Sequence, residues 1–240
     1  MTRSIEVARG RNAVQAVGGL RLAGVLAIGG LVLTGVLGGC NIIGPASYLV
    51  SGPEKVPAAY TLNPELTTVV FVDDPLSVFP SRDARLAVGQ ACEEQLLNEK
   101  YLKDMIQSRQ VLQHLRGEKR TEPVSIAKVG QALGAKVIIY ALVTRFGLSS
   151  DGQTYSPTAS MDVKVVDAVT GERLFPGPGA PRDSLTIELS ESGRPEFTSR
   201  SRGELAQLEV AFAKRLGLRL AKVFYEWIPE TQVDRREEGR

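Results

Sequence analysis

Few side chains in this 240-residue chain could carry out catalysis, and those few do not form a catalytic set. Asp73 and Asp74 follow an apolar, β-branched segment, where open α/β sheets often place catalytic or metal-binding carboxylates. We interpret them instead as loop carboxylates that cap the turn at Pro75, because no histidine or second acidic cluster complements them. His114 is the only histidine, which leaves a Cys/His metal cluster without ligands and disfavours a Ser-His-Asp triad. The sequence therefore predicts no catalytic, metal-binding or cofactor-binding residues.

The residue with the clearest chemistry is Cys40, which follows directly on an apolar run. Residues 22–39 carry no charge, and the charges before them are mostly arginine, which is the order of a secretory signal. The residues at the boundary, Leu37, Gly38, Gly39 and Cys40, resemble the lipobox read by the lipoprotein signal peptidase. A thiol is required there because its sulfur accepts a diacylglyceryl group, and two or three acyl chains hold a protein firmly to a bilayer. We therefore predict cleavage before Cys40 and a covalent lipid on that residue.

Two further interpretations of the leader stay open. As a helix, residues 22–39 would span about 27 Å, close to the thickness of a bilayer core, so an uncleaved transmembrane anchor is one of them. The six glycines of the run weaken that interpretation. A leader of 39 residues is also longer than is usual, and a start site further downstream would explain its length. Asn41 rather than Asp follows the cysteine, which by resemblance to other bacterial lipoproteins implies the outer membrane rather than the inner one.

The composition is that of a folded globular protein without a polyanionic partner. Hydrophobic residues make up 43% of the chain and charged residues 23%. Four of the 29 basic and one of the 27 acidic residues precede Cys40, so the chain from Cys40 onward has 25 basic and 26 acidic side chains. This balance excludes the basic footprint of a nucleic-acid binder. Cys92, the only other cysteine, is expected to be a buried apolar residue, and no disulfide is expected.

These patterns divide the chain into four segments. Residues 1–39 are predicted to be a lipoprotein signal peptide, and residues 40–65, rich in proline and glycine, a lipidated N-terminus and flexible tether. Residues 66–228 have regular hydrophobic periodicity and are predicted to form one periplasmic α/β domain. Residues 229–240 are mostly polar and are predicted to be a tail.

Within the domain, the periodicity predicts the order β-α-β-α-α-β, then antiparallel strands, then a long helix. Strands are expected at residues 67–72, 103–107, 137–143, 159–165 and 184–190. Helices are expected at residues 82–98, 108–115, 123–134 and 201–227. Ser201 and Glu204 form a capping box at the start of the last helix, and Trp227 is expected to pack in the core at its end. Residues 137–143 are apolar without alternation, which predicts the centre of the sheet.

Turn residues mark the ends of two of these elements. Gly134 closes a helix at a position that favours the left-handed conformation, and Thr170 with Gly171 reverses the chain after the strand at 159–165. The early βαβ crossovers and the late antiparallel meander predict an α/β (α+β) fold. Its mixed sheet has about five strands, with helices packed on one face or both and a long C-terminal helix.

Two short segments carry a resemblance to a known group of envelope domains. Residues 130–143 (GQALGAKVIIYALV) place Leu-Gly-Ala directly before the central strand, and residues 161–175 (MDVKVVDAVTGERLF) end a later strand in Asp-Ala-Val-Thr-Gly-Glu. In both, the chain resembles the periplasmic α/β domain of the curli-secretion lipoprotein CsgG, the amino-terminal domain of TolB and the activator lipoprotein LpoB. The resemblance covers about residues 67–227 and implies scaffold or adaptor work. Pore formation is not expected, because the residues between Phe146 and Ala159 are few and all small or polar.

The sequence therefore predicts a membrane-anchored envelope lipoprotein that faces the periplasm. We expect a non-enzymatic adaptor or scaffold, held to membrane lipid by acyl chains on Cys40, that binds a periplasmic or envelope protein or a second copy of itself. No nucleic acid and no small-molecule cofactor are expected as partners. One alternative is a subunit of an export, secretion or transport assembly, such as a ring-forming lipoprotein. The other is a hydrolase that uses Asp73 or Asp74.

Overall fold

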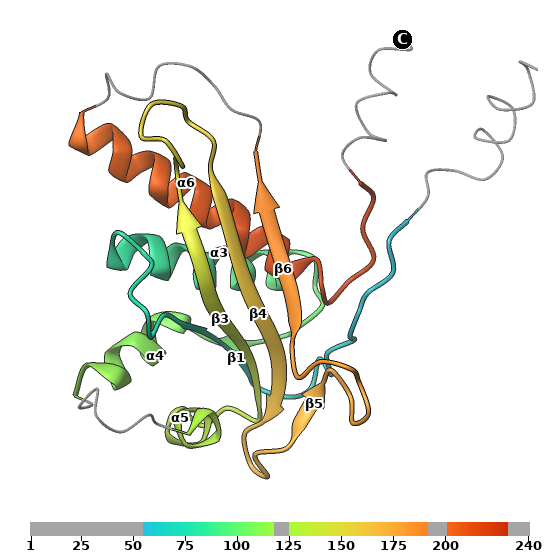
Figure 1. The fold of residues 1–240 in the computed structure, drawn as a ribbon. Helices are drawn as coiled ribbons and strands as arrows, with labels where there is room; N and C mark the ends of the chain where they lie inside the picture. Colours follow the sequence, from blue (N-terminus) through green and yellow to red (C-terminus); the bar gives the residue numbers. More distant parts are fainter. Residues whose placement is uncertain (1–54, 118–124, 192–200, 230–240) are drawn as a thin grey trace, which may run out of the picture. The chain divides into compact units, whose positions relative to one another are not determined.

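A mixed sheet of six strands lies at the centre of this computed structural model, which describes residues 55–117, 125–191 and 201–229. The strands are β1 (Thr68–Asp73), β2 (Met105–Ile106), β3 (Val137–Gly147), β4 (Thr158–Asp167), β5 (Arg173–Phe175) and β6 (Leu185–Ser190). Their order is β2-β1-β3-β4-β5, and β6 also pairs with β4 (Figure 1). The predicted α/β fold with a mixed sheet is thus confirmed. The leader, the cleavage residues Leu37, Gly38 and Gly39, Cys40 and the polar tail lie outside the described residues.

The strand directions follow from the connections between the strands. β1 pairs in parallel with both β2 and β3, since helices link these strands in the chain. β3 pairs antiparallel with β4, from Val137 opposite Asp167 to Gly147 opposite Thr158. The first five residues of β3 are all buried, as expected for the central strand of a sheet covered on both faces.

The predicted antiparallel meander needs a correction in its last step. β5 pairs with β4 at Val165 and Val166, and β6 pairs with β4 along Thr158–Val163. The two strands therefore lie one after the other along the same edge of β4, and β6 does not pair with β5. Residues 176–181, which separate them, are prolines, glycines and one alanine. Proline has no amide hydrogen to donate and glycine weakens a strand, so this segment leaves the edge before β6 rejoins it.

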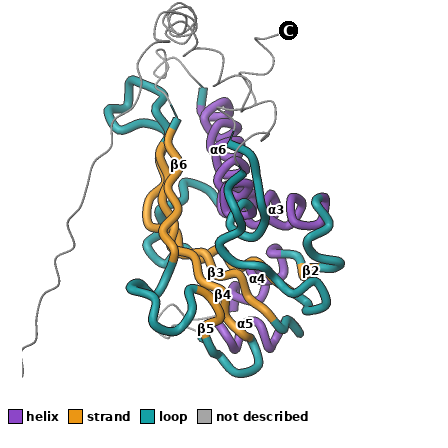
Figure 2. The backbone as a smooth tube through the Cα atoms, turned by 90° about the vertical axis from the view of Figure 1, so that its right-hand side faces the viewer, coloured by secondary structure: helices purple, strands orange, loops and turns teal. Residues whose placement is uncertain are grey.

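Helices cover both faces of the sheet. They are α3 (Arg82–Asn98), α4 (Ser108–His114), α5 (Ile126–Leu133) and α6 (Arg202–Ala221), and a 3₁₀ turn (Leu115–Gly117) follows α4. α3 and α6 share a core with one face of β1, β3 and β4, whereas α4 and α5 pack on the other face of β1 and β3. Figure 2 shows α3 and α6 together on one side of β6. No helix in the described ranges is long and apolar enough to cross a bilayer.

Within the described ranges, no helix packs on the front face of β6 and of the first part of β4, and α5 contacts only the far end of β4, near Lys164. In Figure 1, α3 and α6 lie behind β3, β4 and β6, and the front of these strands is open to view. Asp162 and Lys164 on this face of β4 are half-buried, and Thr186 and Glu188 of β6 are exposed. The alternation of β4 between buried apolar and wetter polar residues therefore follows the predicted pattern.

The layer of α3 and α6 depends on a close helix crossing at Gly217. A Cβ atom added at this glycine would lie 2.2 Å from the carbonyl oxygen of Val88 and 2.9 Å from the Cβ of Ala91, both in α3. Such contacts are far inside van der Waals distance. Only glycine therefore allows α6 to approach the backbone of α3 this closely.

The last helix is shorter than predicted, and the predicted tether is partly packed. α6 ends at Ala221 rather than Trp227, because the backbone that follows bonds to residues of the N-terminal segment. The amides of Ala59 and Tyr60 donate to the carbonyl of Val223, at 2.8 and 3.2 Å, and Val56 forms an antiparallel bridge with Trp227. These long-range bonds replace the helical ones, so residues 56–62 belong to the domain and not to a tether.

A buried carboxylate joins α3 to α4. Glu93 of α3 accepts a hydrogen bond from the backbone amide of Ser108, the first residue of α4, and only 7% of Glu93 is exposed. Burial raises the pKa of Glu93 to about 7, although the hydrogen bonds from Ser108 act to lower it. Because burial disfavours the charged form of Glu93, the folded state is more stable at acidic pH, where this carboxyl is protonated.

The crossing at Gly217 gives a first prediction. Replacement Gly217→Ala should lower the free energy of unfolding by about 1–3 kcal/mol, because the added methyl group forces α6 away from α3. Gly203→Ala is the matched control in the same helix, since an added Cβ there meets nothing within 4 Å. The control should be neutral or slightly stabilising. Urea unfolding of both variants tests this, and equal midpoints for Gly217→Ala and the wild type would contradict the packing argument.

The burial of Glu93 gives a second prediction. Its folded pKa of about 7 lies above the ordinary value of 4.5, so its contribution to stability is complete below pH 4.5 and is lost as the pH rises through 7. The loss is up to about 3 kcal/mol. Glu93→Gln keeps an acceptor for Ser108 and should flatten the fall in stability between pH 4.5 and pH 7.5. The exposed Glu172→Gln is the control and should leave the wild-type slope unchanged.

Candidate functional site

The two adjacent aspartates at the end of β1 have separate structural roles. The carboxylate of Asp74 accepts hydrogen bonds from the amides of Val78 (2.7 Å) and Phe79 (3.2 Å), so it caps the turn as predicted. Asp73 instead accepts a hydrogen bond from the hydroxyl of Tyr140 at 2.7 Å and lies 3.7 Å from the guanidinium of Arg85. Asp73 therefore holds β1 to β3 and α3, whereas Asp74 stabilises the loop that follows β1.

The two side chains that contact Asp73, Tyr140 and Arg85, are engaged in hydrogen bonds that hold the fold together. Burial, followed by the hydrogen bond and charge of Asp73, raises the pKa of Tyr140. The hydroxyl of Tyr140 thus stays protonated and donates to the carboxylate. The Nε of Arg85 donates to the carbonyl of Val72 at 2.9 Å. The cluster therefore links β1, β3 and α3, and its geometry supports a structural role rather than that of a general acid or base.

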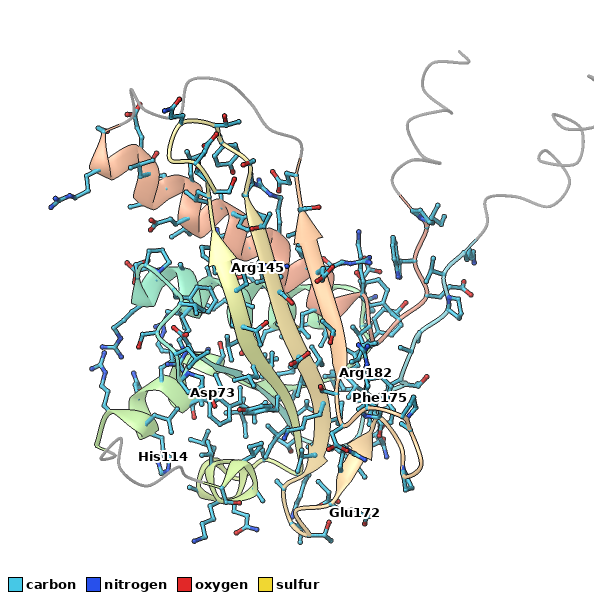
Figure 3. The ribbon with its side chains drawn as sticks, viewed as in Figure 1. Asp73, His114, Arg145, Glu172, Phe175 and Arg182 are labelled. Carbon is cyan, nitrogen blue, oxygen red and sulfur yellow. The ribbon has the colours of Figure 1, made fainter. Side chains whose placement is uncertain are left out.

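The remaining reactive side chains lie apart from this cluster. Figure 3 shows His114 at the end of α4, away from Asp73, and its side chain is exposed. Cys92 is fully buried in α3, and burial raises its pKa well above the ordinary value, which keeps the thiol protonated. Within the described ranges, no group of three or more His, Cys, Asp or Glu side chains is placed to hold a metal ion.

The predicted turn residues lie together and connect α5 to the β4–β5 turn. Gly134 has φ +78° at the end of α5, and Gly171 has φ +75° after Thr170. The side chain of Gln131 donates to the carbonyl of Ala168 at 2.7 Å, and the amide of Ala168 donates to the carbonyl of Lys136 at 2.8 Å. The two motifs of the sequence resemblance thus contact each other, and they position a turn rather than a ligand.

A large cleft lies between α6 and β6, and we call it the α6–β6 cleft. Its volume is about 890 Å³, within the range of ligand-binding clefts. Its main lining residues come from β6, α6 and the segments that follow them: Glu188, Leu189, Ser190, Glu191, Arg215, Leu218, Arg219, Lys222 and Trp227. Figure 1 shows α6 behind β6.

The wall formed by α6 and the segment after it is basic and carries Trp227, the only tryptophan of the chain. The guanidinium of Arg219 lies 4.9 Å from the centre of the Trp227 ring, and the Nζ of Lys222 lies 4.6 Å from it. Both distances are those of cation–π contacts. Trp227 is half-buried and packs against the main core, so the predicted core packing holds for one side of the ring. The ring therefore presents an apolar surface between two positive charges.

At the other end of this wall, the positive charge of Arg215 is neutralised by a carboxylate. Arg215 forms an ion pair with Glu191 and also donates to the hydroxyl of Tyr155 at 3.2 Å. None of the ion pairs between described residues uses Arg219. The positive potential of the cleft is thus concentrated around Trp227.

The edge of β6 that faces the cleft has open backbone groups. The amide of Glu191 donates to the carbonyl of Pro157 at 3.1 Å, so residue 191 is a hydrogen-bonded position of the β4–β6 pair. In an antiparallel pair, such positions alternate with positions whose N–H and C=O groups point outward. Thr186, Glu188 and Ser190 therefore point their backbone groups away from β4. Among the strands that the structure describes, β6 pairs only with β4, so β6 is an edge strand of this sheet.

The N-terminal segment enters the domain beside the cleft. Val56 exchanges backbone hydrogen bonds with Trp227, at 2.8 and 3.1 Å, and the Nζ of Lys55 lies 2.6 Å from a carboxylate oxygen of Glu226. The chain that leads back to Cys40 therefore leaves the domain next to the Trp227 ring. From the sequence, an exposed binding patch at Trp227 was the alternative to core packing, but the bridge to Val56 could not be predicted because the two residues are far apart in the chain.

Comparisons with known proteins give similarity of structure only. No protein-family model and no curated protein matches the chain. A lipoprotein of Neisseria meningitidis is 17% identical, with 63% of this chain and 99% of that chain covered and a TM-score of 0.37. The PelC dodecamer of Paraburkholderia phytofirmans is 10% identical, with 70% of this chain and 95% of that chain covered and a TM-score of 0.34. The LpoB C-terminal domain of Salmonella enterica is 12% identical, with 53% of this chain and 84% of that chain covered and a TM-score of 0.32. Resemblance to CsgG and TolB stays a prediction.

The charges around Trp227 give a third prediction. At low salt, iodide should quench the fluorescence of Trp227 several-fold more strongly than caesium, because the positive potential of Arg219 and Lys222 concentrates anions at the ring. Arg219→Gln should reduce the difference. Lys214→Gln, which removes an exposed charge of α6 outside the cleft, should leave it unchanged. Equal quenching by the two ions in the wild type would show that the ring is not in a positive environment.

Proposed function

We propose that this protein is a lipid-anchored envelope protein that binds a protein partner through the α6–β6 cleft and carries out no catalysis. The anchor is the lipidated Cys40, the domain faces the periplasm, and the outer membrane is its location. The observation that carries the proposal is the position of the cleft, because it opens beside the segment that leads to the predicted anchor.

The cleft has the composition of a protein-binding surface. Protein interfaces are enriched in aromatic residues and arginine, and Trp227 and Arg219 supply both. Leu218 is 39% exposed on the same wall and adds apolar area. These residues are held by α6 and by the Val56–Trp227 bridge, so the surface is already formed before a partner arrives.

The chemistry of the other sites supports binding rather than catalysis. Asp73 is hydrogen-bonded to Tyr140, and Asp74 caps a turn. The motifs around Gly134 and Gly171 position a turn. A hydrolase would need a nucleophile or an activated water near a free carboxylate, and these contacts occupy both carboxylates.

The anchor gives a fourth prediction. In fractionated cells, the wild-type protein should be in the membrane fraction with diacylglyceryl on an N-terminal Cys40, and Cys40→Ser should lose the lipid and leave that fraction. Mass spectrometry of the mature N-terminus and immunoblots of the fractions measure this. Cys92→Ala is the control, because it removes the other thiol without touching the anchor.

Two results would overturn the anchor. One is a Cys40→Ser protein that stays in the membrane fraction with its leader intact, which indicates a transmembrane anchor. The other is a wild-type protein found in a soluble fraction with an unmodified Cys40. Density-gradient separation of the two membranes then tests the outer-membrane location.

A further inference from the structure

We propose that the partner presents an extended, acidic segment that pairs with β6 as an additional strand and lies in the α6–β6 cleft. This inference rests on the proposed function and names the chemistry of the partner at the same site. Three features carry it: the open backbone of β6, the basic wall beside it, and the cleft volume at that edge.

The open edge of β6 has the groups that strand addition requires. Thr186, Glu188 and Ser190 point N–H and C=O groups outward, which is the pattern that an added strand would bond. Proteins usually block such edges with proline, lysine or a covering element. β6 contains neither residue type, and the six-residue edge lies beside an open cleft instead.

The side chains of the cleft select the charge of the added segment. A strand paired with β6 points alternate side chains toward α6, because successive side chains of a strand point to opposite faces. On that side they would meet Leu218 and Trp227, with Arg219 and Lys222 around the ring. In a strand that alternates carboxylates with small apolar side chains, the carboxylates can all face α6, where they meet Arg219 and Lys222 and their methylene groups lie on Leu218 and Trp227. The small apolar side chains then all lie on the opposite face, beside Glu188.

Charge also argues against a second copy of this chain at the same edge. Antiparallel pairing of β6 with β6 of another copy, centred on Glu188, would place two Glu188 residues opposite each other, and like charges opposite one another are destabilising. It would also bring together two walls that both carry Arg219. An acidic segment meets neither repulsion.

The test uses full-length mature protein purified from membranes in detergent and an acetylated eight-residue peptide of alternating Glu and Val. The peptide should change the fluorescence of Trp227 on binding. It should also slow hydrogen exchange of the amides of Thr186, Glu188 and Ser190 at least tenfold. The same peptide with Lys in place of Glu should bind at least tenfold more weakly.

Two pairs of variants separate strand pairing from charge. Glu188→Pro removes an outward amide and spares the bonds to β4, so it should weaken peptide binding at least tenfold, whereas Glu188→Ala keeps the amide and should bind like the wild type. Arg219→Glu should weaken binding at least tenfold, and Lys214→Glu should not. Circular dichroism confirms that each variant is folded. Equal binding by Glu188→Pro and Glu188→Ala, or unprotected edge amides in the complex, would overturn strand addition.

Photo-crosslinking in intact cells distinguishes this inference from the proposed function. A photoreactive residue at position 188 should capture the partner, and one at Thr144 on the open face serves for comparison. Capture only from Thr144 would reject the cleft as the site, and with it both this inference and the binding surface of the proposed function. Capture from position 188 together with equal peptide binding by Glu188→Pro and Glu188→Ala would reject strand addition alone and leave the proposed function standing. Capture from neither position, together with a monomeric native protein, would reject the adaptor function itself. Concentration-dependent self-association that Glu188→Pro abolishes would instead identify a second copy as the occupant and overturn the acidic segment.

Discussion

Gly217 lets the backbone of α6 contact the backbone of α3 at Val88, and the position of both helices on the sheet follows from this contact. With no side chain between them, the two helices fit in one layer over β1, β3 and β4. The C-terminal half of α6 then reaches the edge of the sheet, beside β6. A wider spacing of the helices would displace Arg219 and Lys222 from that edge. The cleft is therefore a result of close packing elsewhere in the core.

Most elements could be predicted from local patterns in the sequence. The helix at Arg82–Asn98 has the bounds that its periodicity indicated, and the apolar run that begins at Val137 is the central strand. Gly134 marks the end of α5 because its φ of +78° is strained for other residues. These features depend on neighbours in the chain, which the sequence displays directly.

The errors all concern contacts between distant residues. Local periodicity continues through Trp227, but α6 ends at Ala221 because Val223 bonds to the backbone of residues 59 and 60. The same bonds turn part of the predicted tether into folded chain. The placement of β6 beside β4, too, depends on a choice of strand partner that alternation does not encode. Asp74 could be assigned from its position before Pro75, whereas the partners of Asp73 required the fold.

The bridge between Val56 and Trp227 has a mechanical consequence. Tension along the chain from the side of Cys40 reaches the folded domain first at Lys55 and Val56. The first backbone bonds to bear it are those to Trp227, and the sheet lies behind them. In the proposed lipid-anchored protein, a displacement of the membrane relative to a bound partner would thus move the tryptophan ring before it disturbed any strand. Tension on the N-terminal segment would therefore be transmitted directly to the proposed binding surface.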